Sequence, residues 1–377
     1  MAGIYLHIPF CKKACHYCDF HFSTSTQYKD QMLSALRNEI ILRKQYLGKE
    51  IIETIYLGGG TPSVLNADEI HFLIDEITSR FEVRSDAEIT LEANPDDLNA
   101  QKVKELRQTP VNRFSIGVQS FFDEDLKWMN RAHNSTEAES SVKRVQDAGF
   151  ENITVDLIYG FPLLNEVKWN QNIQKLIDFQ IPHISSYSMT VEPKTALASF
   201  IRKGKEQTMN ENQSSGQFLA LIRRLTEAGF EHYEISNFAK PGMYSRHNSN
   251  YWEGVNYLGI GPSAHSFNGE SRQWNIANNH RYMQEIQQNK IPAETEYLTP
   301  QNRINEYIMT SLRTSKGLNL GLIAERFGPD YYQSVRKGIE ELSDKNWLEV
   351  TDQTVILSTE GKLFADHIAS ALFITED

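Results

Sequence analysis

The three cysteines of this 377-residue chain lie within eight positions, as Cys11, Cys15 and Cys18. Three thiolates on one short loop can each bind a different iron of a 4Fe-4S cube, whose usual complement is four cysteines. The fourth iron then stays open to a small molecule. The Cys-x3-Cys-x2-Cys spacing is typical of enzymes that bind S-adenosylmethionine at that iron and cleave it to a radical after one-electron reduction. The sequence therefore predicts a 4Fe-4S cluster and an S-adenosylmethionine site.

Two simpler explanations of the cysteines stay open at this point. Structural zinc sites usually pair cysteines as Cys-x2-Cys and recruit a fourth ligand, and His16 or His21 would serve here. A structural disulfide would leave one thiol over, and nothing in the chain suggests export. The cluster is our prediction, and zinc is the first alternative.

Polar residues follow the expected strands at the points where those strands end. They are Glu92, Gln119 and Asp156, with Arg131 nearby. The run at 58–62 (Gly-Gly-Gly-Thr-Pro) also follows a strand, and its missing side chains would let backbone groups approach a ligand closely. In barrels of parallel strands the chemistry gathers at the carboxyl ends of the strands. Carboxylates suit hydroxyl or ammonium groups and a guanidinium suits a carboxylate, which together match an amino acid joined to a ribose.

Short β-rich runs alternate with longer amphipathic stretches, which predicts an α/β protein with a parallel sheet. Periodicity alone does not separate a partial barrel from a doubly wound sheet, but the strand-end residues favour a partial (β/α)6 barrel. The expected strands are 4–8, 54–57, 88–91, 113–117, 154–158 and 184–188, and the expected helices are 27–46, 67–79, 100–107, 137–148 and 167–179.

From about residue 299 the pattern changes to three helices and a hairpin, typical of a small winged-helix-like domain. The expected helices are 303–312, 320–327 and 331–345, and the expected strands are 348–350 and 355–357. Residues 300–377 carry eight Lys and Arg against twelve Asp and Glu. This charge favours packing or partner docking over DNA binding. The predicted organisation is a barrel over 1–235, a connecting region over 236–298 and this domain over 299–377.

The length predicts one large domain and a smaller one. The net charge of −11 argues against binding nucleic acid through its backbone. No leader-like segment precedes the first strand, and no apolar stretch reaches membrane-spanning length. We therefore expect a cytoplasmic protein that is not an integral membrane protein.

The run from Tyr5 to Cys11 (Tyr-Leu-His-Ile-Pro-Phe-Cys), leading into Cys15 and Cys18, resembles the radical S-adenosylmethionine (radical SAM) family of oxygen-independent coproporphyrinogen III dehydrogenases. The blocks at 58–62, 91–95, 115–121, 130–131 and 156–162 resemble that family in the same order, so the resemblance covers nearly the whole chain. It implies that the cofactor is contacted by Tyr5, Tyr17, Gly59, Gly60, Thr61, Glu92, Gln119, Arg131 and Asp156, with Ser188 and His265 as weaker assignments.

Two departures from the dehydrogenases indicate a related group, the HemW heme chaperones. The dehydrogenases have a fourth cysteine where this chain has Phe20, and they carry an amino-terminal extension before the first strand. The run 247–252 (His-Asn-Ser-Asn-Tyr-Trp) also resembles the His-Asn-x-x-Tyr-Trp motif of the chaperones. Imidazole is a good ligand for heme iron and aromatic rings suit a macrocycle, so His247 is our candidate heme ligand.

This resemblance implies a carrier that binds heme and passes it to an acceptor protein, for which a protein at the membrane surface is one candidate. The residues alone leave open that His247 only caps a turn, and that His7, His16, His21 or His265 binds heme instead. The alternative function is the radical decarboxylation of coproporphyrinogen III. A homodimer also stays open.

Overall fold

The computed structural model describes residues 1–375 and shows an α/β protein built on one twelve-stranded sheet. The strand order is β12-β11-β10-β9-β1-β2-β3-β4-β5-β6-β8-β7. Strands β1 to β6 run parallel to one another, which confirms the predicted class. Their bounds are Ala2–Ile8 (β1), Ile52–Gly59 (β2), Val83–Ala93 (β3), Arg113–Gln119 (β4), Asn152–Tyr159 (β5) and His183–Ser188 (β6).

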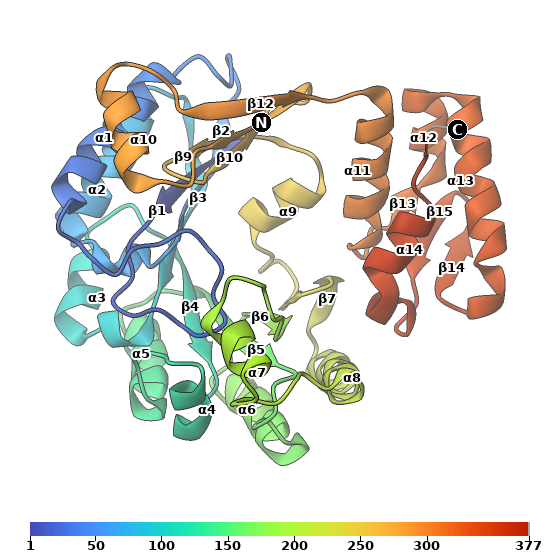
Figure 1. The fold of residues 1–377 in the computed structure, drawn as a ribbon, viewed down its shortest axis with the longest axis horizontal. Helices are drawn as coiled ribbons and strands as arrows, with labels where there is room; N and C mark the ends of the chain where they lie inside the picture. Colours follow the sequence, from blue (N-terminus) through green and yellow to red (C-terminus); the bar gives the residue numbers. More distant parts are fainter. Residues whose placement is uncertain (376–377) are drawn as a thin grey trace.

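Helices connect these parallel strands and form the outer layer of the partial barrel. Figure 1 shows them along the left and lower edges of the molecule, with the strands inside. Every helix predicted between the parallel strands is present, with ends shifted by a few residues. The helices are Lys29–Leu42 (α1), Ala67–Thr78 (α2), Ala100–Leu106 (α3), Asp123–Trp128 (α4), Ser135–Asp147 (α5) and Glu166–Asp178 (α6).

Local sequence explains where these elements begin and which way they face. In β1 only Tyr5 is partly exposed, as expected for a parallel strand covered on both faces. Helix α2 begins with a capping box formed by Asn66 and Glu69, and α5 begins with one formed by Asn134 and Glu137. Such caps fix where each loop becomes helix. The candidate residues Glu92, Gln119 and Asp156 lie in strands β3, β4 and β5 themselves.

The sheet continues through residues 236–298, which we expected to be a connecting region. Strand β9 is parallel to β1, and β10 to β12 extend that edge antiparallel. At the other edge β8 pairs antiparallel with β6 and β7. The bounds are Glu231–Glu234 (β7), Asn237–Ala239 (β8), Asn256–Ile260 (β9), His265–Phe267 (β10), Ser271–Asn275 (β11) and Ala293–Tyr297 (β12).

Helix α9 (Arg246–Trp252) carries the His-Asn-Ser-Asn-Tyr-Trp run between β8 and β9. Figure 1 shows it on the inner side of the strands, away from α1 and α2. The other helices of this part are Ala196–Arg202 (α7), Glu211–Glu227 (α8) and Asn279–Gln287 (α10).

The carboxy-terminal residues form a separate layer at the right of Figure 1, with a hydrophobic core of their own. Its three-stranded sheet has the order β13-β15-β14. The predicted helix 331–345 ends earlier, at Glu341, and a 3-10 turn follows. The elements are Pro300–Leu312 (α11), Leu318–Asn319 (β13), Leu320–Phe327 (α12), Pro329–Glu341 (α13), Leu348–Thr351 (β14), Thr354–Leu357 (β15) and Ala365–Ala371 (α14).

Backbone hydrogen bonds dock this layer on the barrel. The Ile235 N–H donates to the Arg313 carbonyl at 3.0 Å, and the Ser315 N–H donates to the Tyr233 carbonyl at 2.9 Å. Over residues 1–375, no helix combines the length and apolar character needed to cross a membrane.

Candidate functional site

The cysteine loop leaves the end of β1 and is closed at its base. The Cys11 N–H donates to the Ser23 carbonyl at 3.0 Å. Farther along, the His16 N–H donates to the Met129 carbonyl at 3.1 Å, and the His16 carbonyl accepts from the Leu197 N–H at 2.8 Å. The loop is therefore closed on itself beside β1, and the barrel fixes it at His16 through two bonds, one just after α4 and one at the start of α7.

The three thiols are half-buried, and two of them accept hydrogen bonds from outside the loop. The Thr61 hydroxyl donates to Cys11 Sγ and Arg131 Nη1 donates to Cys15 Sγ, each at 3.3 Å. Burial raises the pKa of Cys11 and raises that of Cys18 to about 12. Because iron binds thiolates, cluster assembly here must release protons.

Each histidine considered as a zinc ligand has one ring nitrogen bonded within the protein. His16 Nδ1 donates to the Trp128 carbonyl at 2.8 Å, and His21 Nε2 is hydrogen-bonded to Asn279 Oδ1 at 2.7 Å. Throughout residues 1–375, no three His, Cys, Asp or Glu side chains are gathered closely enough to hold one metal ion. A cluster does not require such a gathering, because each thiolate binds a different iron. This geometry supports a cluster over zinc.

Glu92, near the end of β3, accepts two hydrogen bonds. The Tyr56 hydroxyl donates to Oε1 at 2.8 Å, and the Gly59 N–H donates to Oε2 at 3.1 Å. Burial raises the pKa of Glu92 to about 7; the Asp156 carboxylate adds to the rise and the two hydrogen bonds oppose it. Burial makes the Glu92 carboxylate costly to ionise without a partner. A cationic ligand beside it would favour the charged form, so the residue suits such a ligand.

Asp156 of β5 shares this interior with Glu92. The Ser115 hydroxyl lies 3.3 Å from Asp156 Oδ1 and donates to it. Burial raises the pKa of Asp156 to about 6, although hydrogen bonds from Ser115 and Ser185 lower it. The structure thus brings together the two carboxylates that the sequence placed at separate strand ends.

The glycines after β2 allow close packing against the end of β1. Gly59 has φ +107°, and a Cβ there would lie 2.5 Å from the His7 ring. A Cβ on Gly60 would lie 2.7 Å from the Phe10 carbonyl oxygen. The resemblance assigns Gly59 and Gly60 to cofactor contact. The structure shows that they also allow close packing against the neighbouring strand and direct the Gly59 N–H at Glu92.

Arg131 joins the cysteine loop to the strand ends. Its Nη2 donates to Asn94 Oδ1 at 2.5 Å and to the Gly117 carbonyl at 2.7 Å, while Nη1 reaches Cys15. Its buried Nε has no hydrogen-bond partner within the described residues. Gln119, at the end of the same strand β4 as Gly117, has φ 68°, a strained conformation common at functional sites. A free buried guanidinium N–H fits a carboxylate ligand.

Two tyrosines assigned by the resemblance lie close to these groups. The Tyr5 hydroxyl is 3.3 Å from His7 Nδ1, and the Tyr5 ring stacks on Tyr56 with centroids 6.0 Å apart. Tyr17 is half-buried in the cysteine loop, where desolvation raises its pKa and the Arg131 charge opposes the rise. We call the cysteine loop with Tyr17, together with Tyr5, Glu92, Arg131 and Asp156, the cradle.

Ser188 and His265, the weaker assignments, differ in their positions. Ser188 ends β6, with its hydroxyl 2.7 Å from that of Ser214. His265 is exposed on β10, where its ring lies 6.3 Å from that of Trp274. Strand β9 separates β10 from β1, and no interaction joins His265 to the cradle residues within the described chain.

His247, the candidate heme ligand, is buried inside the barrel with an exposed fraction of 2%. Its Nδ1 is hydrogen-bonded to Thr54 Oγ1 at 2.8 Å and its Nε2 to the Tyr251 hydroxyl at 3.0 Å. Burial lowers the pKa of His247 to about 3. In this arrangement neither ring nitrogen is available to heme iron.

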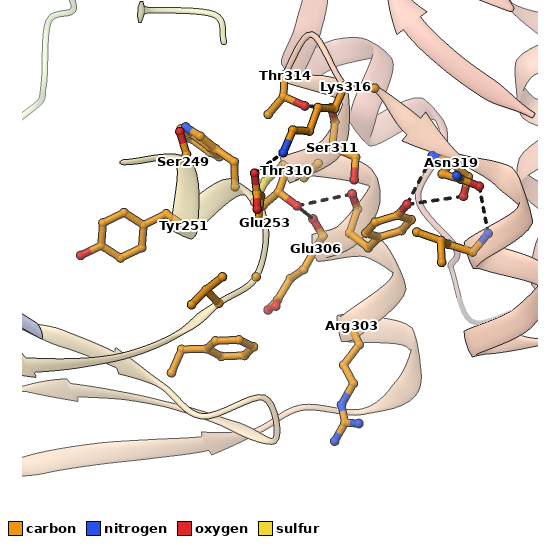
Figure 2. A pocket seen from close by; sticks show the side chains of 18 of the residues that line it. Ser249, Tyr251, Glu253, Arg303, Glu306, Thr310, Ser311, Thr314, Lys316 and Asn319 are labelled. Carbon is orange, nitrogen blue, oxygen red and sulfur yellow. Dashed lines mark hydrogen bonds and ion pairs between the residues drawn. The ribbon is translucent and has the colours of Figure 1, made fainter. Parts of the chain in front are cut away.

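A cleft of about 870 Å³ separates α9 and β9–β11 from α11 and α12. Ligand sites typically measure about 300–1,000 Å³. Ion pairs join its sides: Arg272 to Glu306 at 3.0 Å, and Lys316 to Glu253. Figure 2 shows Glu306 on α11 and Tyr251 on α9. We call this space the α9–α11 cleft.

The cradle fits a 4Fe-4S cluster and S-adenosylmethionine. Three half-buried thiols would hold three irons, the free Arg131 Nε would bind a carboxylate, and Glu92 and Asp156 would accept hydrogen bonds from hydroxyl or ammonium groups. The cofactor pair, when bound and reduced, supplies a carbon radical. The protein residues themselves bind and orient.

Sequence reasoning missed three residues that hold the cradle together: Tyr56, Asn94 and Ser115. Each hydrogen-bonds a predicted residue, namely Glu92, Arg131 and Asp156 respectively. The alternation of side chains along a strand could have indicated these residues, because side chains two positions apart face the same side of the sheet.

Comparisons with known proteins agree with this geometry. Residues 5–176 match the model of the radical SAM superfamily, and residues 298–364 match the HemN C-terminal domain. The chain is 34% identical to the heme chaperone HemW of Bacillus subtilis, over 98% of this chain and 99% of the relative. It is 35% identical to HemW of Escherichia coli over 70% and 69% of the two chains. Coproporphyrinogen III oxidase (HemN) of E. coli has the same fold, with a TM-score of 0.86 at 24% identity, covering 99% of this chain and 90% of that one.

The fold and the cysteine loop define a radical SAM protein. Within that class, the near full-length similarity to the relatives shows that the chain belongs to the HemW family.

Proposed function

We propose that this protein is a heme chaperone that binds heme, transfers it to an acceptor protein and retains a 4Fe-4S cluster and an S-adenosylmethionine site. The relatives from B. subtilis and E. coli are named heme chaperones, which supports the heme part of the proposal. The thiols and the carboxylates of the cradle support the cofactor part.

The observation that carries the choice of chaperone over dehydrogenase is Phe20. The dehydrogenases have a fourth cysteine at this position, and here an apolar side chain is 69% exposed. It supplies no ligand to iron and offers contact surface beside the cluster loop. The radical decarboxylation of coproporphyrinogen III is therefore the second candidate; the shared fold with HemN supports the fold alone.

The proposal extends to location and partners. The chaperone acts in the cytoplasm, where reduced thiols hold a cluster, and delivers heme to an acceptor protein, with one at the membrane surface as the first to test. Tetrapyrrole metabolism is the setting that this cargo implies.

A hemin titration of the anaerobically reconstituted protein, followed by the Soret band, tests the function. We expect saturable binding of one hemin per chain. Absent or unsaturable binding would overturn the chaperone proposal, and release of carbon dioxide from coproporphyrinogen III would establish the second candidate.

A further inference from the structure

We propose that the α9–α11 cleft is the tetrapyrrole site, and that it recognises the flat ring and the two carboxylates of a dipropionate porphyrin. This inference rests on the proposed heme function and adds the location and chemistry of binding. The cradle residues, which are hydrogen-bonded to one another, are already assigned to the cluster and S-adenosylmethionine, so the tetrapyrrole needs a separate space.

Two pairs of half-buried aromatic side chains line the cleft from opposite sides. On the sheet side, the rings of Tyr257 (β9) and Phe267 (β10) have centroids 6.1 Å apart. On the other side, those of Tyr307 (α11) and Phe327 (α12) have centroids 6.4 Å apart. Four aromatic side chains facing one space offer the apolar walls that a macrocycle requires.

The cleft also presents two arginines without partners. Arg303 on α11 and Arg326 on α12 are exposed, and neither guanidinium group forms an ion pair or hydrogen bond within residues 1–375. The other two cations of the lining, Arg272 and Lys316, are paired with Glu306 and Glu253.

Arg303 and Glu306 lie one turn apart on the face of α11 that lines the cleft (Figure 2). Guanidinium groups bind carboxylates through paired N–H donors. Arg303 and Arg326, both unpaired, therefore match two propionates.

Iron coordination is a smaller part of this recognition. No histidine or cysteine of the described chain lines the cleft. Its lining includes the thioether of Met309 as a sulfur group. His247 lies behind Tyr251, with both nitrogens bonded. The ring and its carboxylates, which a metal-free porphyrin shares with heme, must then supply most of the affinity.

The test compares the double variant Arg303→Gln/Arg326→Gln with the native protein and with a matched control, Arg336→Gln/Lys337→Gln, on α13 outside the cleft. Each protein is titrated with hemin and with hemin dimethyl ester, whose carboxylates are capped. We expect the double variant to bind hemin about 100-fold more weakly, about tenfold per arginine. The ester should bind native protein and double variant equally weakly, and the control should match native protein.

Two further measurements test whether hemin occupies the cleft and whether its binding requires iron. Thr310→Trp, which fills the cleft from α11, should abolish hemin binding, and metal-free protoporphyrin IX should compete with hemin. Circular dichroism and cluster content verify that each variant is folded.

The results separate the two proposals. Native protein without saturable hemin binding overturns the proposed function. Native binding that the arginine variant and Thr310→Trp leave unchanged, or that the ester reproduces, overturns the cleft alone. Failure of the metal-free porphyrin to compete overturns recognition through the ring.

Discussion

The His247 ring stacks on the Tyr56 ring, with centroids 4.9 Å apart and planes 25° from parallel. Tyr56 in turn donates to Glu92, and His247 is bonded to Tyr251, which lines the α9–α11 cleft. A continuous row of contacts therefore joins the cleft to the cofactor cradle. It gives the histidine of α9 a positioning role inside the barrel.

Replacing His247 with Leu should destabilise the protein by about 1–3 kcal/mol, because Thr54 and Tyr251 lose their buried hydrogen-bond partner. Urea denaturation of the apoprotein measures this loss. His247→Gln should recover part of it and leave the position of the Soret band unchanged. A Soret shift in the Gln variant, with normal stability, would instead restore His247 as a heme ligand.

The stability of the apoprotein should depend on pH through Glu92. Its pKa of about 7 in the folded chain lies above the ordinary value of 4.5, so the native carboxyl holds a proton that the unfolded chain has lost. This stabilisation is complete below about pH 4 and disappears as the pH rises through 7. Glu92→Gln should therefore be more stable than native protein at pH 8, by about 1–3 kcal/mol, and equal to it near pH 4. A difference that does not change with pH in urea denaturation would contradict this cause.

The same carboxylate should make cofactor binding depend on pH in the opposite sense. Ionised Glu92 and Asp156 attract a cationic ligand, so S-adenosylmethionine should bind more weakly as the pH falls through 7 and then 6. Calorimetry on the reconstituted protein measures this dependence. Glu92→Gln should weaken binding at pH 8 about tenfold and remove the upper part of the pH dependence. Unchanged affinity in both Glu92→Gln and Asp156→Asn would remove these residues from the site.

The cradle was largely predictable from the sequence, whereas the cleft was not. Parallel strands end at a common edge, so Glu92 and Asp156 could be brought together from their strand assignments alone. Arg131 follows a short helix that periodicity did not reveal, so its contact with Cys15 could not be predicted from the strands. The burial of His247 was not predictable from the sequence, because it depends on how α9 packs over β1 and β2. The cleft depends on the docking of α11 against α9, which no local pattern encodes.

Arg131 should set the reduction potential of the cluster as well as bind the cofactor. Its Nη1 donates to Cys15 Sγ at 3.3 Å, and its charge lies beside the loop. Hydrogen bonds to sulfur and nearby positive charge both favour the reduced cluster. Arg131→Gln should therefore shift the midpoint potential to more negative values in a redox titration followed by electron paramagnetic resonance. Arg131→Lys, which keeps the charge but loses the planar fork, should shift it less.

Cys15→Ala provides the reference for this experiment, because it should leave the chain folded and remove the visible absorption of the cluster. The cysteine loop is anchored by backbone hydrogen bonds at Cys11 and His16, so its fold does not depend on that thiol. A cluster band that persists in Cys15→Ala would refute the ligand assignment. An unchanged or more positive potential in Arg131→Gln would show that the contact seen between the guanidinium and the sulfur does not survive cluster assembly.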